Sequence, residues 1–217
     1  MNCIVTAGPT YEPLDGARRI TNFSTGRLGC ELANHLFDRG HKVSLLLGEQ
    51  STWNGPLRVT SPLRFSTGSD LSSKLAALAG TEAGAVFHAA AVADFCFGRA
   101  WRRNDAGQLD PVREGKFQTE GGPLMVELTP TPKIIANLRS WFPGAFIVGW
   151  KYEVEGDRQG VMLRAAEQIR RNGTDACVAN GPGYGAGCGI VLADGTATHA
   201  QTHDELFAAL AALIPAR

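Results

Sequence analysis

Glycines and hydroxyl side chains follow the first apolar segment of the chain in a pattern that could bind an anion. Gly8 comes directly after that segment, and Ser24, Thr25, Gly26 and Gly29 stand at the start of a helical pattern. Glycines let the backbone approach a ligand, and the first N–H groups of a helix point toward a bound anion. The spacing matches neither G-x-G-x-x-G nor the P-loop pattern. From the residues alone, the stretch is either a phosphate site or a capped structural loop.

Further polar stretches follow other apolar segments of the chain. Together with residues 8–29, these stretches are the residues from 94 onward, 151–156 and 180–189. In an open parallel sheet, ligands bind beyond the carboxyl ends of the strands. The pattern therefore predicts where a ligand binds and leaves open what the ligand is.

The elements that must position these residues are predicted by hydrophobic periodicity. Continuous apolar runs typical of buried parallel strands occur at residues 3–7, 43–47, 85–92, 145–150 and 176–179. Amphipathic stretches typical of helices occur at residues 28–40, 70–79, 158–172 and after the capping-box pattern Thr202-x-x-Glu205. Strands that alternate with helices imply βαβ crossovers. The expected fold is therefore α/β, a Rossmann-like, doubly wound and mostly parallel sheet.

One long segment departs from this alternation. Residues 93–144 are polar and rich in glycine, with short strand candidates only near 116–118 and 124–128. Segments of this length inside compact domains tend to be functional or disordered. Since no linker composition is present, we expect one domain over residues 1–217, with an arm or mobile segment at about 95–130.

Composition excludes several classes of protein. The 217 residues include 21 basic and 21 acidic side chains, a balance that argues against non-specific binding to nucleic acid or to anionic membranes. No apolar run reaches transmembrane length and no signal-peptide pattern opens the chain, so a cytoplasmic location is expected. The five cysteines show no C-x-x-C spacing and the histidines no metal spacing. We expect free, mostly buried thiols and no metal site built by the protein.

Six groups of short motifs occur in one order along most of the chain. They are Gly8-Pro9-Thr10 with Asn22-Phe23-Ser24-Thr25-Gly26-Arg27-x-Gly29, Ala90-Ala91-Val92-Ala93-Asp94-Phe95, Lys116-Phe117-Gln118 with Gly121-Gly122-Pro123-Leu124, Pro132-Lys133-Ile134-Ile135, Trp150-Lys151-Tyr152-Glu153 and Val178-Ala179-Asn180. In this order they resemble the phosphopantothenate–cysteine ligases, also called phosphopantothenoylcysteine synthetases, of coenzyme A biosynthesis.

The resemblance implies a ligase that joins 4′-phosphopantothenate to cysteine. A nucleoside triphosphate, ATP or CTP, activates the substrate carboxylate as an acyl-nucleotide with release of pyrophosphate, and the cysteine amine then displaces the nucleotide. Activation crowds negative charge at the α-phosphate, so the reaction calls for N–H donors, a cation and Mg²⁺.

The resemblance also assigns roles to individual residues. It implies the catalytic residues Asn22 and Lys116, the nucleotide-binding residues Gly8, Ser24, Gly26, Gly29, Trp150 and Asn180, and the substrate-binding residues Asn22, Ala90, Ala91 and Asp94. These residues also have structural alternatives. Asn22 and Ser24 could cap the following helix, and Asp94 could cap a turn. Lys116 could be a solvated loop residue, and Trp150 could be a core residue.

Three positions depart from the family pattern. Arg113-Glu114-Gly115-Lys116 replaces a lysine-rich motif, and Trp150 stands where phenylalanine is usual; both features favour ATP over CTP. After Asn180 the chain continues as Gly181-Pro182-Gly183-Tyr184-Gly185 in place of an acidic continuation. This last change leaves the nucleotide pocket open to divergence.

Two other classes of function remain open from the sequence. The α/β pattern would suit an NAD(P)-dependent oxidoreductase, although the dinucleotide glycine spacing is missing. A nucleotide-binding relative that has lost catalysis is the second alternative, because of the changed loop after Asn180. By resemblance we expect small-molecule substrates, a homodimer formed through an arm near residues 110–130, and no flavin, since no decarboxylase domain precedes Met1.

Overall fold

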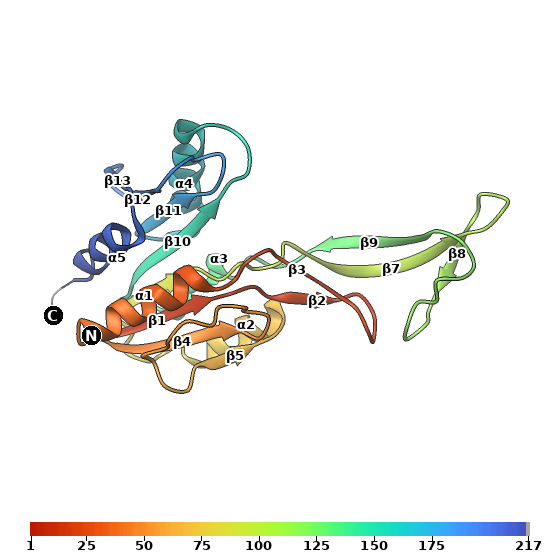
Figure 1. Ribbon diagram of the computed structural model, residues 1–217, viewed down its shortest axis with the longest axis horizontal. Helices are drawn as coiled ribbons and strands as arrows, with labels where there is room; N and C mark the ends of the chain where they lie inside the picture. Colours follow the sequence, from red (N-terminus) through yellow and green to blue (C-terminus); the bar gives the residue numbers. More distant parts are fainter. Residues whose placement is uncertain (216–217) are drawn as a thin grey trace.

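The protein, seen here as a computed structural model that describes residues 1–215, is built on an eight-stranded sheet (Figure 1). Its strands are β1 (Asn2–Ala7), β4 (Lys42–Gly48), β5 (Leu63–Phe65), β6 (Ala85–His88), β10 (Phe146–Tyr152), β11 (Ala176–Asn180), β12 (Cys188–Leu192) and β13 (Ala197–Ala200). They follow the order β13-β12-β11-β10-β6-β1-β4-β5; β12 pairs antiparallel with both β11 and β13, and all other neighbouring strands pair parallel. The expected α/β fold with a mostly parallel sheet is confirmed.

Helices cover both faces of this sheet. They are α1 (Arg27–Asp38), α2 (Gly68–Ala77), α3 (Ile135–Trp141), α4 (Arg158–Asn172) and α5 (His203–Ala212). One core cluster joins Leu32 of α1 and Leu206 of α5 to Val5 of β1, whereas Leu71 of α2 packs with the preceding β1 residue, Ile4, in another. Alternate residues of one strand face opposite sides of the sheet, so α1 and α5 form one layer and α2 lies in the other. Among the described residues, no helix combines the length and apolar composition that crossing a membrane requires.

One predicted strand is too long. The apolar run at residues 85–92 predicts a single strand, yet β6 ends at His88. The backbone then leaves the sheet, because the Ala91 N–H donates to the Gly8 carbonyl oxygen (3.0 Å) and the Thr10 N–H donates to the Ala91 carbonyl oxygen (3.1 Å). Residues 89–92 therefore form a turn that is bound to the loop after β1.

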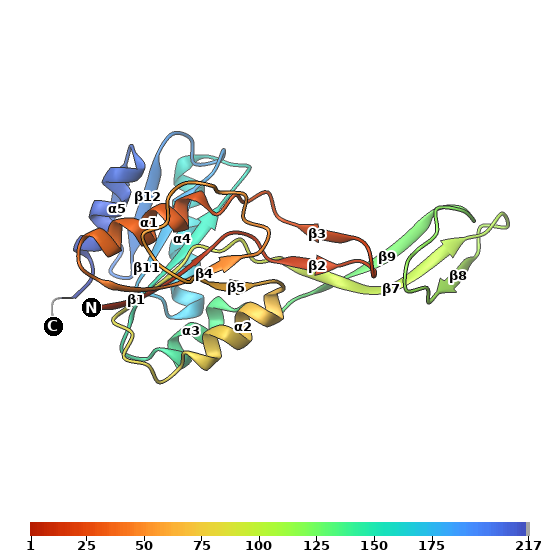
Figure 2. The ribbon, with the colours of Figure 1, turned by 60° about the horizontal axis from the view of Figure 1, so that its bottom comes forward.

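A three-stranded antiparallel arm projects from the body of the molecule (Figures 1 and 2). It consists of β7 (Phe95–Arg103), β8 (Leu109–Val112) and β9 (Leu124–Pro130), in the order β8-β7-β9. The expectation of a strand near 116–118 is wrong, since these residues form a loop after β8. The sequence does not predict strand β7, because its short apolar run at 95–97 ends at Gly98 and Arg99. The strand is stabilised by pairing with both neighbours while most of its side chains remain at least partly exposed.

A second, smaller projection lies inside the long loop after β1. Strands β2 (Tyr11–Pro13) and β3 (Arg19–Thr21) form an antiparallel hairpin that extends alongside the arm (Figure 2). Its base is tied to the body, because the Tyr11 N–H donates to the Ser66 carbonyl oxygen (3.1 Å) and the buried Glu12 carboxylate accepts the Gly68 N–H (3.0 Å). The loop thus contains ordered structure that links the sheet to the arm.

Candidate functional site

Two glycines meet at the carboxyl end of β1. Gly8 and Gly26 both adopt a φ of 81°, which other residues rarely tolerate. A Cβ atom on Gly26 would lie 2.5 Å from the Ser51 Oγ and 3.2 Å from the Gly8 Cα. The two backbones are therefore in close contact, and only glycine fits at position 26.

The N-terminus of α1 begins at this contact. Gly26 is its N-cap residue and makes no side-chain cap; the Arg27 N–H has a long contact with the Thr25 Oγ1 (3.3 Å), and the first turn carries no acidic residue. The first N–H groups of a helix have no partner within the helix, and the helix dipole makes this end partly positive. The structural alternative for Asn22 and Ser24, that they cap this helix, is therefore wrong. The uncapped end is suited to binding an anion.

Gly29 has a different role from Gly26. It is buried in α1, and a Cβ atom there would lie 2.6 Å from the Ala7 Cβ and 3.1 Å from the Thr6 carbonyl oxygen. Gly29 thus lets α1 lie directly against β1 and sets the position of the helix N-terminus over the end of the strand.

Asn22 lies at the base of the hairpin, next to the turn after β6. Its Nδ2 donates to the Ala91 carbonyl oxygen (3.1 Å), and the Ala91 N–H donates to the Gly8 carbonyl oxygen (3.0 Å). Three predicted site residues are therefore brought together. Since Nδ2 is engaged, the Asn22 Oδ1 is the atom free to accept a hydrogen bond from a ligand. The Ser24 hydroxyl has no partner among the described residues.

The turn that contains Ala90 is supported by two polar residues that the motifs did not point to. The Ala90 N–H donates to the Thr6 Oγ1 (3.1 Å), and this hydroxyl lies 2.9 Å from the His88 Nδ1. The Thr6 hydroxyl thus joins the turn to the buried imidazole of His88. Burial lowers the pKa of His88 to about 4. The sequence feature that could have identified Thr6 and His88 is their polar character inside otherwise apolar strand segments.

Asp94 is placed at the base of the arm. Its carboxylate forms an ion pair with Lys133, and its carbonyl oxygen accepts the Thr131 N–H (3.0 Å). Both groups of the pair are exposed, so solvent reaches them. Lys133 belongs to the quoted Pro132-Lys133 motif, yet the resemblance assigned it no role; the structure places it against a predicted substrate residue.

Trp150 and Asn180 lie on neighbouring parallel strands, on the face of the sheet covered by α1. Trp150 pairs with Val178, two residues before Asn180, and packs against the same core cluster as Val178. The Trp150 Nε1 and the Asn180 Oδ1 are buried without a hydrogen-bond partner. Leaving such atoms unpaired costs free energy. The Trp150 Nε1 is therefore available as a donor, and the Asn180 Oδ1 as an acceptor, for polar groups of a ligand.

The unusual loop after Asn180 packs tightly against the end of β10. A Cβ atom on Gly181 would lie 2.4 Å from the Glu153 carbonyl oxygen, and one on Gly183 would lie 2.5 Å from the Glu155 carbonyl oxygen. The Gly183 N–H donates to the Glu153 carbonyl oxygen (2.9 Å). The glycines are therefore required by close backbone packing, and the loop holds Asn180 in a defined position.

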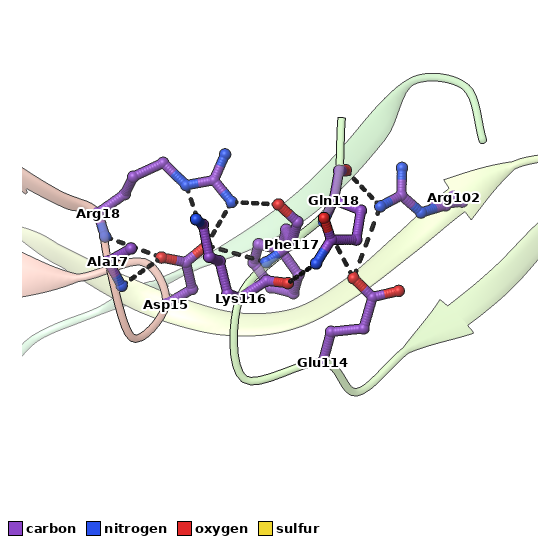
Figure 3. Close-up of polar contacts among 8 residues, drawn as sticks. All are labelled: Asp15, Ala17, Arg18, Arg102, Glu114, Lys116, Phe117 and Gln118. Atoms are coloured by element: carbon purple, nitrogen blue, oxygen red, sulfur yellow. Dashed lines mark hydrogen bonds and ion pairs between the residues drawn. The ribbon is translucent and has the colours of Figure 1, made fainter. Parts of the chain in front are cut away.

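Lys116 lies apart from the other predicted site residues. Its neighbours in the chain contact Asp15, Gly16 and Arg18 at the tip of the β2–β3 hairpin, as Figure 3 shows in part. Asn22, by contrast, contacts Ala91 at the base of the same hairpin. One chain thus assembles Gly8, Asn22, Gly26 and Ala91 in one place and holds Lys116 elsewhere.

A doubly wound sheet with an uncapped helix and two close glycines at its carboxyl edge defines a Rossmann-like α/β protein. Such proteins bind ligands at this edge. The chain belongs to the family described as the DNA/pantothenate metabolism flavoprotein C-terminal domain, which matches residues 1–205.

Several relatives carry the name coenzyme A biosynthesis bifunctional protein CoaBC, among them the following two. The protein of Thermococcus kodakarensis is 34% identical over 178 residues, which is 82% of this chain and 40% of that protein. The protein of Escherichia coli K12 is 30% identical over 179 residues, which is 79% of this chain and 39% of that protein. The chain therefore spans about 40% of the length of these relatives.

Solved structures share the fold. The DNA/pantothenate metabolism flavoprotein from Streptococcus pneumoniae has a TM-score of 0.82 at 22% identity, covering 97% of this chain and 96% of that one. The Cab2 mutant H337A, in a complex with phosphopantothenate-cysteine, has a TM-score of 0.72 at 20% identity, covering 97% and 85%. At this identity the likeness shows the fold alone.

Proposed function

We propose that the protein is a phosphopantothenate–cysteine ligase, which joins 4′-phosphopantothenate to L-cysteine in coenzyme A biosynthesis. The observation that carries this proposal is the meeting of Gly8, Asn22, Gly26 and Ala91 at the uncapped N-terminus of α1. Family membership and the names of the CoaBC relatives support it, as does the phosphopantothenate-cysteine in the Cab2 structure.

The reaction has two steps, and each uses a different part of the site. In the first step a carboxylate oxygen of phosphopantothenate attacks the α-phosphorus of the triphosphate, and pyrophosphate leaves. In the second the cysteine amine attacks the acyl carbon, loses a proton, and the nucleoside monophosphate leaves. The glycine backbone at Gly8 and Gly26 and the first N–H groups of α1 would bind the phosphates.

Asn22 suits the second step. Its Nδ2 is fixed by the Ala91 carbonyl oxygen, so the side chain is held in one orientation. The Oδ1 is then directed to accept an N–H of the incoming amine, which aligns the nitrogen lone pair with the acyl carbon. Holding a nucleophile in this way lowers the entropic part of the barrier.

A nucleotide base would lie toward Trp150 and Asn180, whose unpaired Nε1 and Oδ1 are on the same face as α1. We propose ATP as the co-substrate ahead of CTP. Mg²⁺ would supply charge neutralisation at the phosphates. Since no group of three His, Cys, Asp or Glu residues suited to a metal occurs among the described residues, the triphosphate oxygens and water would hold the ion.

The same proposal includes a homodimer formed through the arm, in the cytoplasm. Apolar side chains on the arm are unusually exposed, with Phe95 at 50% and Leu128 at 52%. A second copy could cover them. A partner chain is also one way to bring Lys116 to a site that contains Asn22, because one chain keeps the two apart.

The test is an assay of pyrophosphate release by the purified protein. Phosphopantothenate, ATP or CTP, and cysteine or other amines are added in all combinations. Release that requires phosphopantothenate and a triphosphate, followed by an amide product with cysteine, supports the ligase. Hydride transfer to NAD(P)⁺ without pyrophosphate would support an oxidoreductase. Nucleotide binding without turnover would support a non-catalytic relative.

A further inference from the structure

The tip of the β2–β3 hairpin binds the backbone of the arm loop on both sides of Lys116. The Gly16 N–H donates to the Gly115 carbonyl oxygen (2.8 Å), and the Phe117 N–H donates to the Asp15 Oδ2 (3.1 Å). The Arg18 Nη2 donates to the Phe117 carbonyl oxygen (2.6 Å), as seen in Figure 3. We call this set of contacts the hairpin latch.

Asp15 is the centre of the hairpin latch. Its side chain is only 1% exposed. The Oδ1 accepts the N–H groups of Ala17 and Arg18 (both 2.8 Å), which fixes the turn of the hairpin. The Oδ2 accepts the Arg18 Nε (3.0 Å) as well as the Phe117 N–H. Oδ1 thus bonds only within the hairpin, whereas Oδ2 bonds both to Arg18 of the hairpin and to Phe117 of the arm loop.

The carboxylate stays ionised in this position. The hydrogen bond from the Arg18 guanidinium holds the pKa of Asp15 well below its usual range, with further lowering from backbone N–H groups. An ionised acceptor makes stronger hydrogen bonds than a neutral one. The contact with the Phe117 N–H is therefore charge-assisted throughout the neutral pH range.

The arm holds the same loop from its other side. The Arg102 guanidinium donates to the Gln118 carbonyl oxygen and lies 3.8 Å from the Glu114 carboxylate. The Gln118 N–H donates to the Glu114 Oε2 (3.0 Å). Lys116 lies between these fixed residues, and its ammonium forms no ion pair with any other described residue. The backbone is thus ordered around a lysine whose charge is available to a ligand.

The hairpin latch is connected directly to the proposed site. Strand β3 runs from the latch to Asn22, and the Thr21 Oγ1 donates to the Thr10 carbonyl oxygen (2.9 Å). The same hairpin therefore bears Asn22 at its base, held against Ala91, and the contacts to the Lys116 loop at its tip.

We propose that Asp15, with Arg18, is a positioning residue that couples the Lys116 segment to the hairpin bearing Asn22. The inference rests on the proposed ligase function and on Lys116 as its cation. Without the latch, the lysine would sample many positions, and its stabilisation of the reacting phosphate would fall.

Asp15→Asn tests this selectively. The amide oxygen of the new side chain retains the two turn hydrogen bonds, whereas its NH₂ group would face the Phe117 N–H and the Arg18 guanidinium, which are donors. The hairpin should fold while the arm loop is released. Asp110→Asn is the matched control, because Asp110 is another arm carboxylate, bonded to Asn104 (3.1 Å), and touches neither the latch nor the loop.

Two measurements decide the outcome. Hydrogen–deuterium exchange of the Phe117 amide should accelerate in Asp15→Asn and stay unchanged in Asp110→Asn. The kcat for pyrophosphate release should fall about 10-fold in Asp15→Asn with little change in the KM for the triphosphate. In a Lys116→Gln background the same substitution should have no further effect on kcat, because Asp15 acts through the lysine.

Several results would overturn the proposal. Unchanged exchange would show that the latch does not hold the loop. An unchanged or higher kcat would show that the latch holds the lysine in a resting position. An equal loss in both backgrounds would show general structural damage. If the wild-type protein released no pyrophosphate, the proposed function would fall and the role of Asp15 with it, which is distinct from a failure of Asp15→Asn alone.

Discussion

The loop around Gly26 and the loop around Lys116 are held in place by different means. The first is fixed by backbone packing at the end of the central sheet, where a Cβ atom on Gly26 would collide with Ser51. The second is fixed by charged side chains from two projections, with Asp15 and Phe117 separated by 102 residues in the chain. Backbone packing gives a rigid position, whereas contacts between exposed projections can be released. An anion cradle needs the former, whereas Lys116 depends on the latter, because its proposed contribution falls when the hairpin latch is lost.

The strongest test of the rigid loop around Gly26 is Gly26→Ala. A Cβ at a φ of 81° is strained by about 1–3 kcal/mol and would also lie 2.5 Å from the Ser51 Oγ. We expect activity to fall more than ~100-fold through lost phosphate binding, since moved N–H donors commonly cost that much. Steady-state kinetics and a triphosphate titration measure the loss.

Gly40→Ala is the control for this change. Gly40 follows the other end of α1 with a φ of 83°, and no atom lies within 4 Å of a Cβ built there. Both variants should lose thermal stability from the strained φ, Gly26→Ala more because of the Ser51 contact, and only Gly26→Ala should lose triphosphate binding. Comparable binding in both would show that the cradle is not at Gly26.

Lys116→Gln tests the loop that the hairpin latch holds. Removing one stabilising contact to the reacting phosphate costs on the order of 3 kcal/mol, so kcat should fall ~100-fold. Arg113→Gln removes the same charge three residues earlier in the same loop and should retain wild-type turnover. Wild-type kinetics for Lys116→Gln would make Lys116 a solvated loop residue.

Asn22→Asp changes a residue at the base of the hairpin whose tip contacts the Lys116 loop. A carboxylate oxygen would replace the Nδ2 that lies 3.1 Å from the Ala91 carbonyl oxygen, so two acceptors would repel each other. The acyl-nucleotide should still form, and its capture by cysteine should slow about 10-fold, an effect of about 1.4 kcal/mol. Rapid-quench analysis should show the intermediate accumulating. An unchanged overall rate would remove Asn22 from the mechanism.

The smallest expected effect is on the pH dependence of stability, through the buried His88 next to the turn that contains Ala90. The pKa of His88 is lowered to about 4 by burial, against 6.5 for an exposed histidine. The unfolded chain therefore binds a proton as the pH falls through 6.5, while the folded chain resists until about 4. Stability from neutral His88 is present above about pH 6.5 and should fall by about 1 kcal/mol between about pH 7 and 5.5. Urea unfolding at both values measures this, and His88→Gln should remove the part due to His88, while the lowered pKa of His35 and of His41 leaves a remainder.

The sequence predicted the sheet well because buried parallel strands are continuous apolar runs. The run at 85–92 misled because its last residues are equally apolar but pair with Gly8 outside the sheet. Strand β7 carries Arg99, Arg102 and Arg103 and is half exposed, so no apolar run spans it.

The part of the candidate site that lies at strand ends was predictable, as the sheet itself was. Strand order places Gly8, Ala91 and Asn180 at one edge of the sheet, as the motifs indicated. The Asp15–Phe117 contact was not predictable, because it depends on how two projections meet in space rather than on spacing along the chain. The same reason explains why Asn22 and Lys116, both implied as catalytic by the resemblance, lie at opposite ends of the hairpin within one chain.

The outermost strands of the central sheet are short: β5 has three residues and β13 has four. Short borders offer few free N–H and C=O groups to another chain, which limits accidental growth of the sheet into fibres. A proposed second copy is therefore less able to pair with these borders than to cover exposed apolar side chains such as Phe95 and Leu128.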